Sequence, residues 1–287
     1  MRVLLIGAGG FIGRHAQATL HAAGHSVQAL GRASGFDFQR AERPEAWLPQ
    51  LDRSDAAIYL PGTMRDRLHG ERDLLQRLHH RVPLALGQAC VQLGVRRLLH
   101  VSALCGGGSA YARSKQAGDA ALLALAAGGG LDLHIVRPSL VMGAGGVSSR
   151  QFEVLSRLPW LPLPAALQLC RVQPLRVEDL AAALVACLLA PPPTRPWPAV
   201  GPEAAPVPEW LARRRAQRGQ CPAVISTLPG PLVQMSARLG DHLPFSSWSR
   251  EALALLAADS IEPDPHEAAR LPHLLGRPLR PALEGAW

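Results

Sequence analysis

VLLIGAGGFIG, residues 3 to 13, is the stretch of this sequence that decides the fold. Its first four residues, Val3–Ile6, are an apolar run that is too short for a helix and suits a strand buried on both faces. Glycines follow at Gly7, Gly10 and Gly13, and apolar residues then recur at helical spacing over Phe11–Leu20. The stretch therefore predicts a strand, a tight glycine turn and a helix.

A turn of this kind points backbone N–H groups and the start of a helix at one spot, where an anionic phosphate is stabilised. Gly7 lets the chain turn, Gly10 lets a pyrophosphate approach the backbone, and Gly13 lets the helix pack closely on the strand. The spacing is GxxGxxG, one residue away from the GxGxxG dinucleotide fingerprint. A surface loop without a ligand is the alternative, and the flanking strand and helix argue against it.

Short apolar runs and helical patterns alternate along the next part of the chain. This alternation predicts the α/β class, a Rossmann-type doubly wound parallel sheet covered by helices on both faces. The further strands are expected at Ser26–Leu30, Phe36–Phe38, Ala56–Leu60, Arg97–Ser102, Leu133–Val136 and Leu169–Leu175. The further helices are expected at Leu74–Leu93, with an interruption at Pro83, at Tyr111–Ala127 and at Val177–Leu189.

The pattern loosens past about residue 145, which suggests a division of the chain. We expect a dinucleotide-binding Rossmann domain over residues 1–190, with a substrate-loop excursion at about 145–168, and a small, mostly helical substrate lobe over residues 191–287. The excursion would hold a helix at Gln151–Leu158 and a loop at Pro159–Pro164. The proline-rich segment Pro191–Pro208 is interpreted as a connector that crosses the surface.

Composition excludes several classes of protein. The chain has 287 residues and a net charge of +8, but its basic residues are spread thinly and lack the interleaved aromatic residues of a nucleic-acid site. The longest apolar run, Leu180–Ala190, stops at Pro191 and is too short to cross a bilayer. The apolar run after Arg2 is used by the first strand rather than by a signal peptide. We therefore expect a cytoplasmic protein without an integral membrane segment.

The five cysteines are scattered and never stand in CxxC spacing. This pattern favours reduced, mostly buried thiols over a disulfide framework or a zinc site. The histidines, including the pair His79 and His80, also lack the spacing of metal ligands, so we expect no metal.

The end of the second expected strand bears on the choice of cofactor. An acid about 20 residues past the glycines binds the ribose 2′-OH of NAD, whereas an arginine accommodates the 2′-phosphate of NADP. Arg32 stands at this strand end, and no acid precedes Asp37. The sequence therefore favours NADP(H), with NAD(H) as the alternative, and places Asp37 near the adenine.

Tyr111 and Lys115 have YxxxK spacing, which puts both side chains on one face of a helix. A nearby cation lowers the pKa of a phenol, and a tyrosine so tuned exchanges a proton with a carbonyl or alcohol oxygen. Lys115 is the only lysine in a chain that holds two tyrosines and no asparagine, so its retention calls for a reason. Two solvated side chains on a surface helix are the alternative interpretation.

The segments GAGGFIG, HVSALCGGGSAYARSK, RPSLVMG and QPLRVEDLAAAL together resemble the short-chain dehydrogenase/reductases. The resemblance is to the extended and atypical branch, the NAD(P)-dependent epimerase/dehydratase-like proteins. Within this branch the chain looks most similar to bacterial relatives of the NADPH-binding accessory subunit of respiratory complex I. The resemblance covers residues 1 to about 190 and extends more loosely to Gly201–Glu203 and to the closing LLGRPLRP.

The resemblance implies roles for individual residues. Tyr111 and Lys115 would be the catalytic pair, with Lys115 also holding the nicotinamide ribose. The residues that it places at the cofactor are Gly7, Gly10, Phe11, Ile12, Gly13, Arg32, Asp37, Pro61, Gly62, Lys115, Pro138 and Ser139. The family's usual catalytic serine or threonine corresponds to Ala103 here, so Ser102, or Ser109 from the loop, would substitute for it.

These observations leave three functions open. The first is an NADP(H)-dependent oxidoreductase acting on a small molecule. Tyr111 would be its acid/base, Lys115 the partner of Tyr111, and Ser102 a hydrogen-bond donor to the substrate carbonyl. The second is a protein that binds NADPH without turning it over, a structural or assembly factor, which Ala103 favours. The third, a nucleotide-sugar epimerase, is disfavoured by the missing acids after Ser102. Association into an oligomer or with a respiratory complex stays open.

Overall fold

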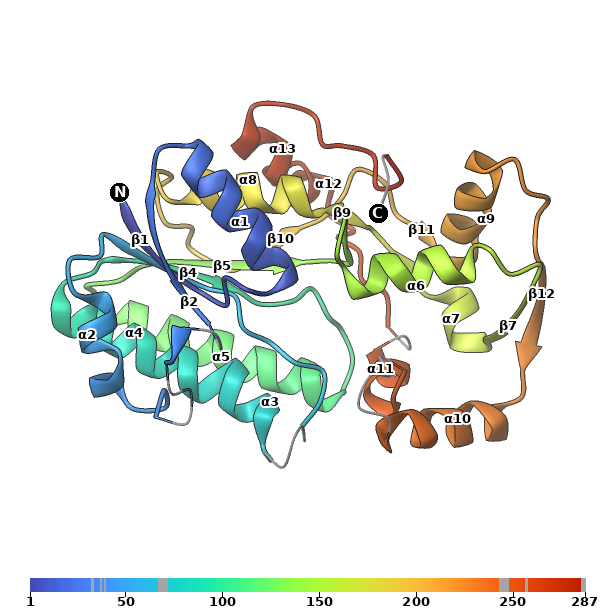
Figure 1. Cartoon of the computed structure of the whole chain (residues 1–287), viewed down its shortest axis with the longest axis horizontal. Helices are drawn as coiled ribbons and strands as arrows, with labels where there is room; N and C mark the ends of the chain where they lie inside the picture. The colour runs from blue at the N-terminus through green and yellow to red at the C-terminus, as the bar shows by residue number, and fades with distance from the viewer. Residues whose placement is uncertain are drawn as a thin grey trace.

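The computed structural model describes residues 1–31, 34–36, 38, 40–66, 72–242, 248–255 and 258–284. A six-stranded parallel sheet lies between two layers of helices, and a smaller lobe extends from one end of it (Figure 1). The strand order is β10-β5-β4-β3-β1-β2. The strands are β1 (Arg2–Ile6), β2 (Ser26–Leu30), β3 (Ala56–Tyr59), β4 (Arg97–Val101), β5 (Asp132–Pro138) and β10 (Trp197–Ala199). This Rossmann-like architecture confirms the predicted fold class.

Strand β1 lies inside the sheet and is buried on both faces. Val3 and Leu5 point into the core on one face of the sheet, whereas Leu4 and Ile6 point into the core on the other. None of the four side chains is exposed to solvent. The uninterrupted apolar run follows from this position, because successive side chains of a strand alternate between faces and both faces are covered here.

The two helical layers enclose these cores (Figure 1). One layer consists of α1 (Phe11–Ala22), α8 (Val177–Cys187), α12 (Pro265–Ala268) and α13 (Arg270–Leu275). The other consists of η2 (Pro44–Ala46), α2 (Leu48–Leu51), α3 (Leu74–Gln76), the π-helical turn η3 (Arg77–Arg81), α4 (Val82–Leu93) and α5 (Ala110–Ala127). The expected interruption of the helix at Leu74–Leu93 is thus η3, just before Pro83.

The smaller lobe has a core of its own, formed around Phe152, Leu163 and Trp210. Its elements are β6 (Val141–Met142), α6 (Val147–Leu155), β7 (Trp160–Pro164), α7 (Ala165–Leu169), β8 (Arg171–Val172), β9 (Leu175–Arg176), β11 (Ala205–Pro206), α9 (Val207–Gln217), β12 (Val224–Leu228), α10 (Gly230–His242) and α11 (Arg250–Leu255). The division into residues 1–190 and 191–287 stays a prediction. Among the described helices, none is long and apolar enough to span a membrane.

Two segments expected to be irregular are strands. The predicted loop at Pro159–Pro164 is wrong, because Trp160–Pro164 forms β7 and pairs in parallel with β12. The predicted surface connector is wrong at Trp197–Ala199, which forms β10 and pairs in parallel with β5 at the edge of the main sheet. Both segments are rich in proline, and an edge strand tolerates proline because one side of it needs no N–H donor.

The predicted strand at Phe36–Phe38 is wrong at its two described residues. Neither Phe36 nor Phe38 is in a strand, and Asp37 lies outside the described residues. The two rings meet edge to face with 5.0 Å between their centroids, and the centroid of the Phe36 ring lies 4.8 Å from that of Trp47. Their apolar surface is buried by the segment that leads into α2, so the sheet ends at β2.

Close backbone contacts explain the glycine at position 13. A Cβ atom there would lie 2.2 Å from the carbonyl oxygen of Gly7, which is below any real contact distance. By contrast, a Cβ atom on Gly9 would meet nothing within 4 Å. Helix α1 therefore approaches the glycine turn more closely than a side chain at position 13 permits.

We predict that Gly13→Ala lowers the free energy of unfolding by about 2 kcal/mol or more, because the added methyl forces α1 away from the turn. Gly9→Ala is the matched control, with an expected change of less than about 0.5 kcal/mol. Denaturant unfolding of the three proteins without added dinucleotide measures both values. Equal stabilities of the two variants would contradict the close packing.

Candidate active site

The glycine turn joins β1 to α1 and leaves backbone donors exposed. Gly7 has a φ of +85°, a conformation that favours glycine, and its N–H donates to the carbonyl of Leu30 at 2.7 Å. Helix α1 begins after Gly10, which offers no side-chain acceptor to the first-turn N–H groups. A helix start without a capping side chain suits an anion such as a dinucleotide pyrophosphate.

The loop after β3 connects the glycine turn with the helix that carries Tyr111 and Lys115. A Cβ atom on Gly7 would lie 3.2 Å from Cδ of Pro61. One residue further, a Cβ atom on Gly62 would lie 3.4 Å from the Nζ atom of Lys115. The carboxyl ends of β1 and β3 and the side chain of Lys115 therefore meet at one edge of the sheet, where parallel sheets bind ligands.

Helix α5 carries Tyr111 and Lys115 in its first two turns. Ser109 begins the helix, and its hydroxyl oxygen accepts the N–H of Ala112 at 3.0 Å. The backbone N–H of Tyr111 donates to the carboxylate of Glu251 on α11. The hydroxyl of Ser109, which the sequence offers as a substitute catalytic serine, thus serves as the cap of the helix.

Lys115 is a buried cation. Its side chain is 3% exposed, and its Nζ donates to the carbonyl of Val101 at 3.2 Å. Burial lowers the pKa of Lys115 from 10.5 to about 8, against the opposing effects of Asp119 and Cys105. Holding this charge at the end of β4 costs free energy, which a nearby anion or phenolate would recover.

The pKa of Tyr111 is raised rather than lowered. Burial is the main cause, and the neighbouring Cys105 and Asp119 add to it. The prediction that the spacing to Lys115 lowers the pKa of this phenol is therefore wrong. Removal of the phenol from water dominates, and Lys115 is not among the groups that shift this pKa.

The residues beneath this pair are polar and buried. The carboxylate of Asp119 accepts a bond from Nε of Arg137 at 2.8 Å, and its other oxygen lies 3.7 Å from Nε2 of His100. The hydroxyl of Ser102 is buried at the end of β4, beside the carboxylate of Asp119. Burial raises the pKa of Asp119, and the Ser102 hydroxyl, Arg137 and Lys115 act against this effect.

Other expected cofactor residues lie in different surroundings. The hydroxyl of Ser139, after β5 and Pro138, donates to the carbonyl of Ser260 at 2.7 Å. The ring of Phe11 at the start of α1, next to Ile12, lies under the loop at Gly146, where a Cβ atom would be 2.9 Å from it. Arg32 and Asp37 lie outside the described residues.

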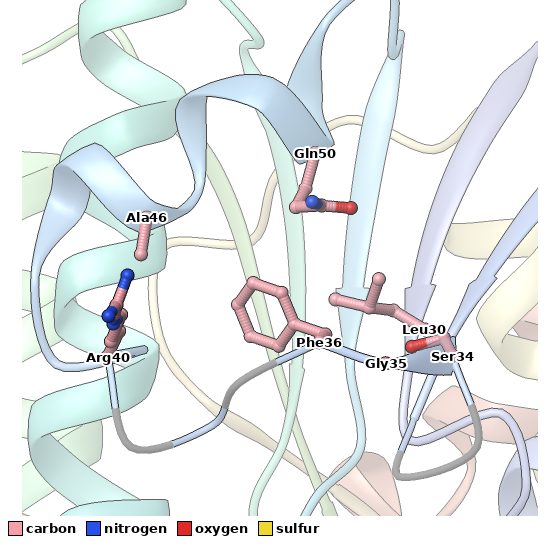
Figure 2. A pocket seen from close by; sticks show the side chains of 7 residues that line it. All are labelled: Leu30, Ser34, Gly35, Phe36, Arg40, Ala46 and Gln50. Atoms are coloured by element: carbon pink, nitrogen blue, oxygen red, sulfur yellow. The ribbon is translucent and has the colours of Figure 1, made fainter.

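A pocket of about 300 Å³ lies at the carboxyl end of β2 (Figure 2). It adjoins the glycine turn, because the N–H of Gly7 donates at 2.7 Å to the carbonyl of Leu30, which lines the pocket. Its polar lining includes Ser34, Arg40 and Gln50, and Phe36 forms part of its wall. This is the place where an adenosine moiety would lie in a dinucleotide that crosses the sheet edge.

Sequence reasoning missed Arg40, His79, Asp119 and Glu251. His79 is fully buried and packs edge-on against Tyr111 at 5.1 Å between ring centroids. Only the spacing of Asp119, four residues after Lys115 on one helix face, could have pointed to its place. The others reach the site from segments far apart in the sequence, and no local pattern marks them.

Comparisons with known proteins agree with this architecture. The model of the NAD dependent epimerase/dehydratase family matches residues 3–161. No curated protein sequence matches the chain. Among solved structures, MoeE5 in complex with UDP-glucose and NAD is similar over 99% of this chain and 96% of that chain, with 18% identity and a TM-score of 0.67.

Two further solved structures share this fold. A UDP-glucose 4-epimerase from Thermus thermophilus in complex with NAD matches 90% of this chain and 98% of its own, with 19% identity and a TM-score of 0.62. RMD from Pseudomonas aeruginosa complexed with NADPH matches 98% and 93%, with 18% identity and a TM-score of 0.67. At these identities the likeness concerns the fold.

We predict that Lys115→Met raises the free energy of unfolding at pH 7 by about 3 kcal/mol, because the wild type must bury a charge that the variant lacks. The folded protein releases this proton near pH 8, whereas the unfolded chain keeps it to about pH 10.5. The free energy of unfolding of the wild type should therefore rise relative to that of the variant as the pH rises from about 8 towards 10.5. Urea unfolding at pH 7, 8 and 9 measures the difference.

Arg113→Met is the matched control, because Arg113 is an exposed cation on the same helix. We expect its effect to stay within about 1 kcal/mol at every pH. A difference between wild type and Lys115→Met that stays constant with pH would contradict a buried, protonated Lys115.

Proposed function

The chain belongs to the NAD dependent epimerase/dehydratase family, and we propose that it is an NAD(P)(H)-dependent oxidoreductase of the short-chain dehydrogenase/reductase type. The observation that carries the proposal is the position of the Lys115 ammonium at the same sheet edge as the glycine turn. Its Nζ lies 3.4 Å from the point that a Cβ atom added to Gly62 would occupy. A dinucleotide on that turn would bring its reactive ring towards Tyr111 and Lys115.

Several residues would hold such a cofactor. The N–H groups after Gly10 face the pyrophosphate, Pro61 and Gly62 line its path, and Lys115 binds the nicotinamide ribose. When bound, the nicotinamide ring supplies or accepts the hydride of the reaction. The buried charge of Lys115 is then compensated by hydrogen bonds to ribose oxygens and by the phenol of Tyr111.

Tyr111 would be the acid/base of the reaction. In the direction of carbonyl reduction, its hydroxyl gives a proton to the substrate oxygen, and the resulting phenolate is stabilised by the Lys115 ammonium. In the direction of alcohol oxidation, the phenolate takes the proton back. The raised pKa of Tyr111 keeps the phenol protonated at neutral pH, which is the state that the first direction requires, but also makes it a weaker proton donor.

Ser102 would donate a hydrogen bond to the substrate oxygen. Its hydroxyl is buried at the end of β4, beside the carboxylate of Asp119. The next residue, Ala103, cannot make this bond, so the oxyanion would have one donor fewer than in the usual arrangement.

The second candidate function is a protein that binds NADPH without turnover. Ala103 is the observation that favours it, together with the resemblance to relatives of a complex I accessory subunit. A partner protein, a respiratory complex or a second copy of the chain would then recognise the form of the protein that has NADPH bound.

Sugar epimerisation is less well supported. The neighbouring structures include nucleotide-sugar enzymes, but the loop after Ser102 begins Ala103-Leu104-Cys105 and offers no carboxylate for general acid/base work. We propose a small carbonyl or alcohol as the substrate class.

We predict that purified protein binds reduced dinucleotide and oxidises it in the presence of an aldehyde, ketone or quinone. Tyr111→Phe should lower kcat by about 100-fold or more, since it removes the proton donor, and leave the dissociation constant of the dinucleotide within about threefold. Nicotinamide absorbance measures turnover, and its fluorescence measures binding. Tight binding without turnover on any substrate would favour the second candidate, and no binding would refute both.

We also propose a preference for NADP(H), on the ground that Arg32 follows the second strand in the sequence and no acid stands between Gly13 and Asp37. Arg32→Ser should weaken NADPH by about tenfold, because it removes a charge-assisted bond to the 2′-phosphate, and leave NADH unchanged. Fluorescence titrations with both nucleotides compare the two affinities. Equal losses for NADPH and NADH would contradict this role.

A further inference from the structure

We infer that His79 is a positioning residue that fixes the cofactor-facing loop Pro61–Thr63 against the first turn of α5. It would thereby set the distance between Gly62 and the pair Tyr111–Lys115. The inference rests on the proposed function for its effect on the cofactor, and on three hydrogen bonds for its geometry.

The first two hydrogen bonds assign the tautomer of His79. The backbone N–H of Thr63 lies 3.1 Å from Nε2 of His79 and can only donate, so Nε2 is unprotonated. A neutral imidazole then carries its proton on Nδ1, which lies 2.8 Å from the hydroxyl oxygen of Ser114. His79 therefore accepts from the loop and donates to the helix.

The third bond continues the chain to the catalytic tyrosine. The hydroxyl of Ser114 donates to the backbone carbonyl of Tyr111 at 2.8 Å. Each donor along this path meets one acceptor, so the path has a single direction from Thr63 to Tyr111. The His79 ring also lies edge-on to the Tyr111 ring, at 84° between the ring planes.

The site of His79 is held from the other side as well. The phenol of Tyr59 on β3 donates to the carbonyl of Leu78 at 2.8 Å. A Cβ atom on Gly118 would lie 1.8 Å from the carbonyl oxygen of His79, so the backbones of η3 and α5 are in close contact. A π-helical turn places an extra residue in its turn, which explains how His79 projects between the loop and the helix.

The charge state of His79 suits a fixed bond rather than proton transfer. Burial, with smaller effects from the neighbouring Lys115 and His100, lowers its pKa to about 2. A protonated ring would set an N–H of Nε2 against the N–H of Thr63. The ring therefore stays neutral over the working pH range and acts through Thr63 and Ser114.

The test uses the full chain, NADPH and NADH as probes, four single variants and one double variant. His79→Phe keeps an aromatic ring against Tyr111 and removes both nitrogens. His79→Gln supplies an acceptor and a donor in one side chain and serves as the conservative rescue. Ser114→Ala removes the middle of the path, and His80→Phe is the matched control on the same turn, where the side chain is half-buried.

We expect His79→Phe to fold and to weaken both dinucleotides by about tenfold, His79→Gln to recover to within about threefold of wild type, and His80→Phe to bind as wild type does. His79→Phe combined with Ser114→Ala should cost less affinity than the product of the two single effects, because both act on one path. Imidazole ¹⁵N NMR of the wild type should show Nε2 of His79 unprotonated and Nδ1 protonated from pH 5 to pH 8.

Three results would overturn the inference. One is an Nε2-protonated His79, which contradicts the path itself. Another is His79→Phe with wild-type affinity. The third is a lower free energy of unfolding in both His79 variants with unchanged affinity for the dinucleotides, which would mean that His79 only stabilises the core. Wild-type protein that binds neither dinucleotide would instead refute the proposed function, and the NMR result would still decide the path.

Discussion

The burial of one ammonium group, that of Lys115, is the constraint on which the rest of the structure depends. The side chain is 3% exposed, and its only direct partner in the described part of the chain is the carbonyl of Val101. A charge in this position is costly unless other groups stabilise it. Asp119 lies one helical turn away and is in turn bound to Arg137, so two cations and one carboxylate lie close together at this sheet edge.

Glycines let backbone segments approach this charge from two directions. Gly62 brings the loop after β3 to Lys115, and Gly118 brings η3 to the back of α5. A side chain at position 118 would overlap the carbonyl of His79. Because Gly118 has no side chain, η3 can approach α5 closely enough for His79 to contact both α5 and the loop after β3. The same close contacts therefore position the buried charge and hold the helix that carries Tyr111 against its neighbours on several sides.

The sequence predicted the central sheet and the glycine turn because both depend on short-range patterns. An apolar run such as Val3–Ile6 is continuous only where both faces are covered, and YxxxK spacing places two side chains on one helix face whatever surrounds it. Proline-rich segments were harder. Trp160–Pro164 and Trp197–Ala199 became strands because partners from elsewhere in the chain lay beside them, and propensity alone gives no sign of such partners.

The sequence by itself determined the fold class, the place of the glycine turn and the position of Tyr111 and Lys115 on one helix, since each follows from residues close together in the chain. Only the tertiary structure decided the electrostatics of the pair and the residues that support it. The pKa of Tyr111 is raised because the phenol is removed from water, an effect that depends on burial and not on spacing. His79 and Asp119 gained their roles in the same way, because the contacts that define them join segments brought together only when the sheet forms.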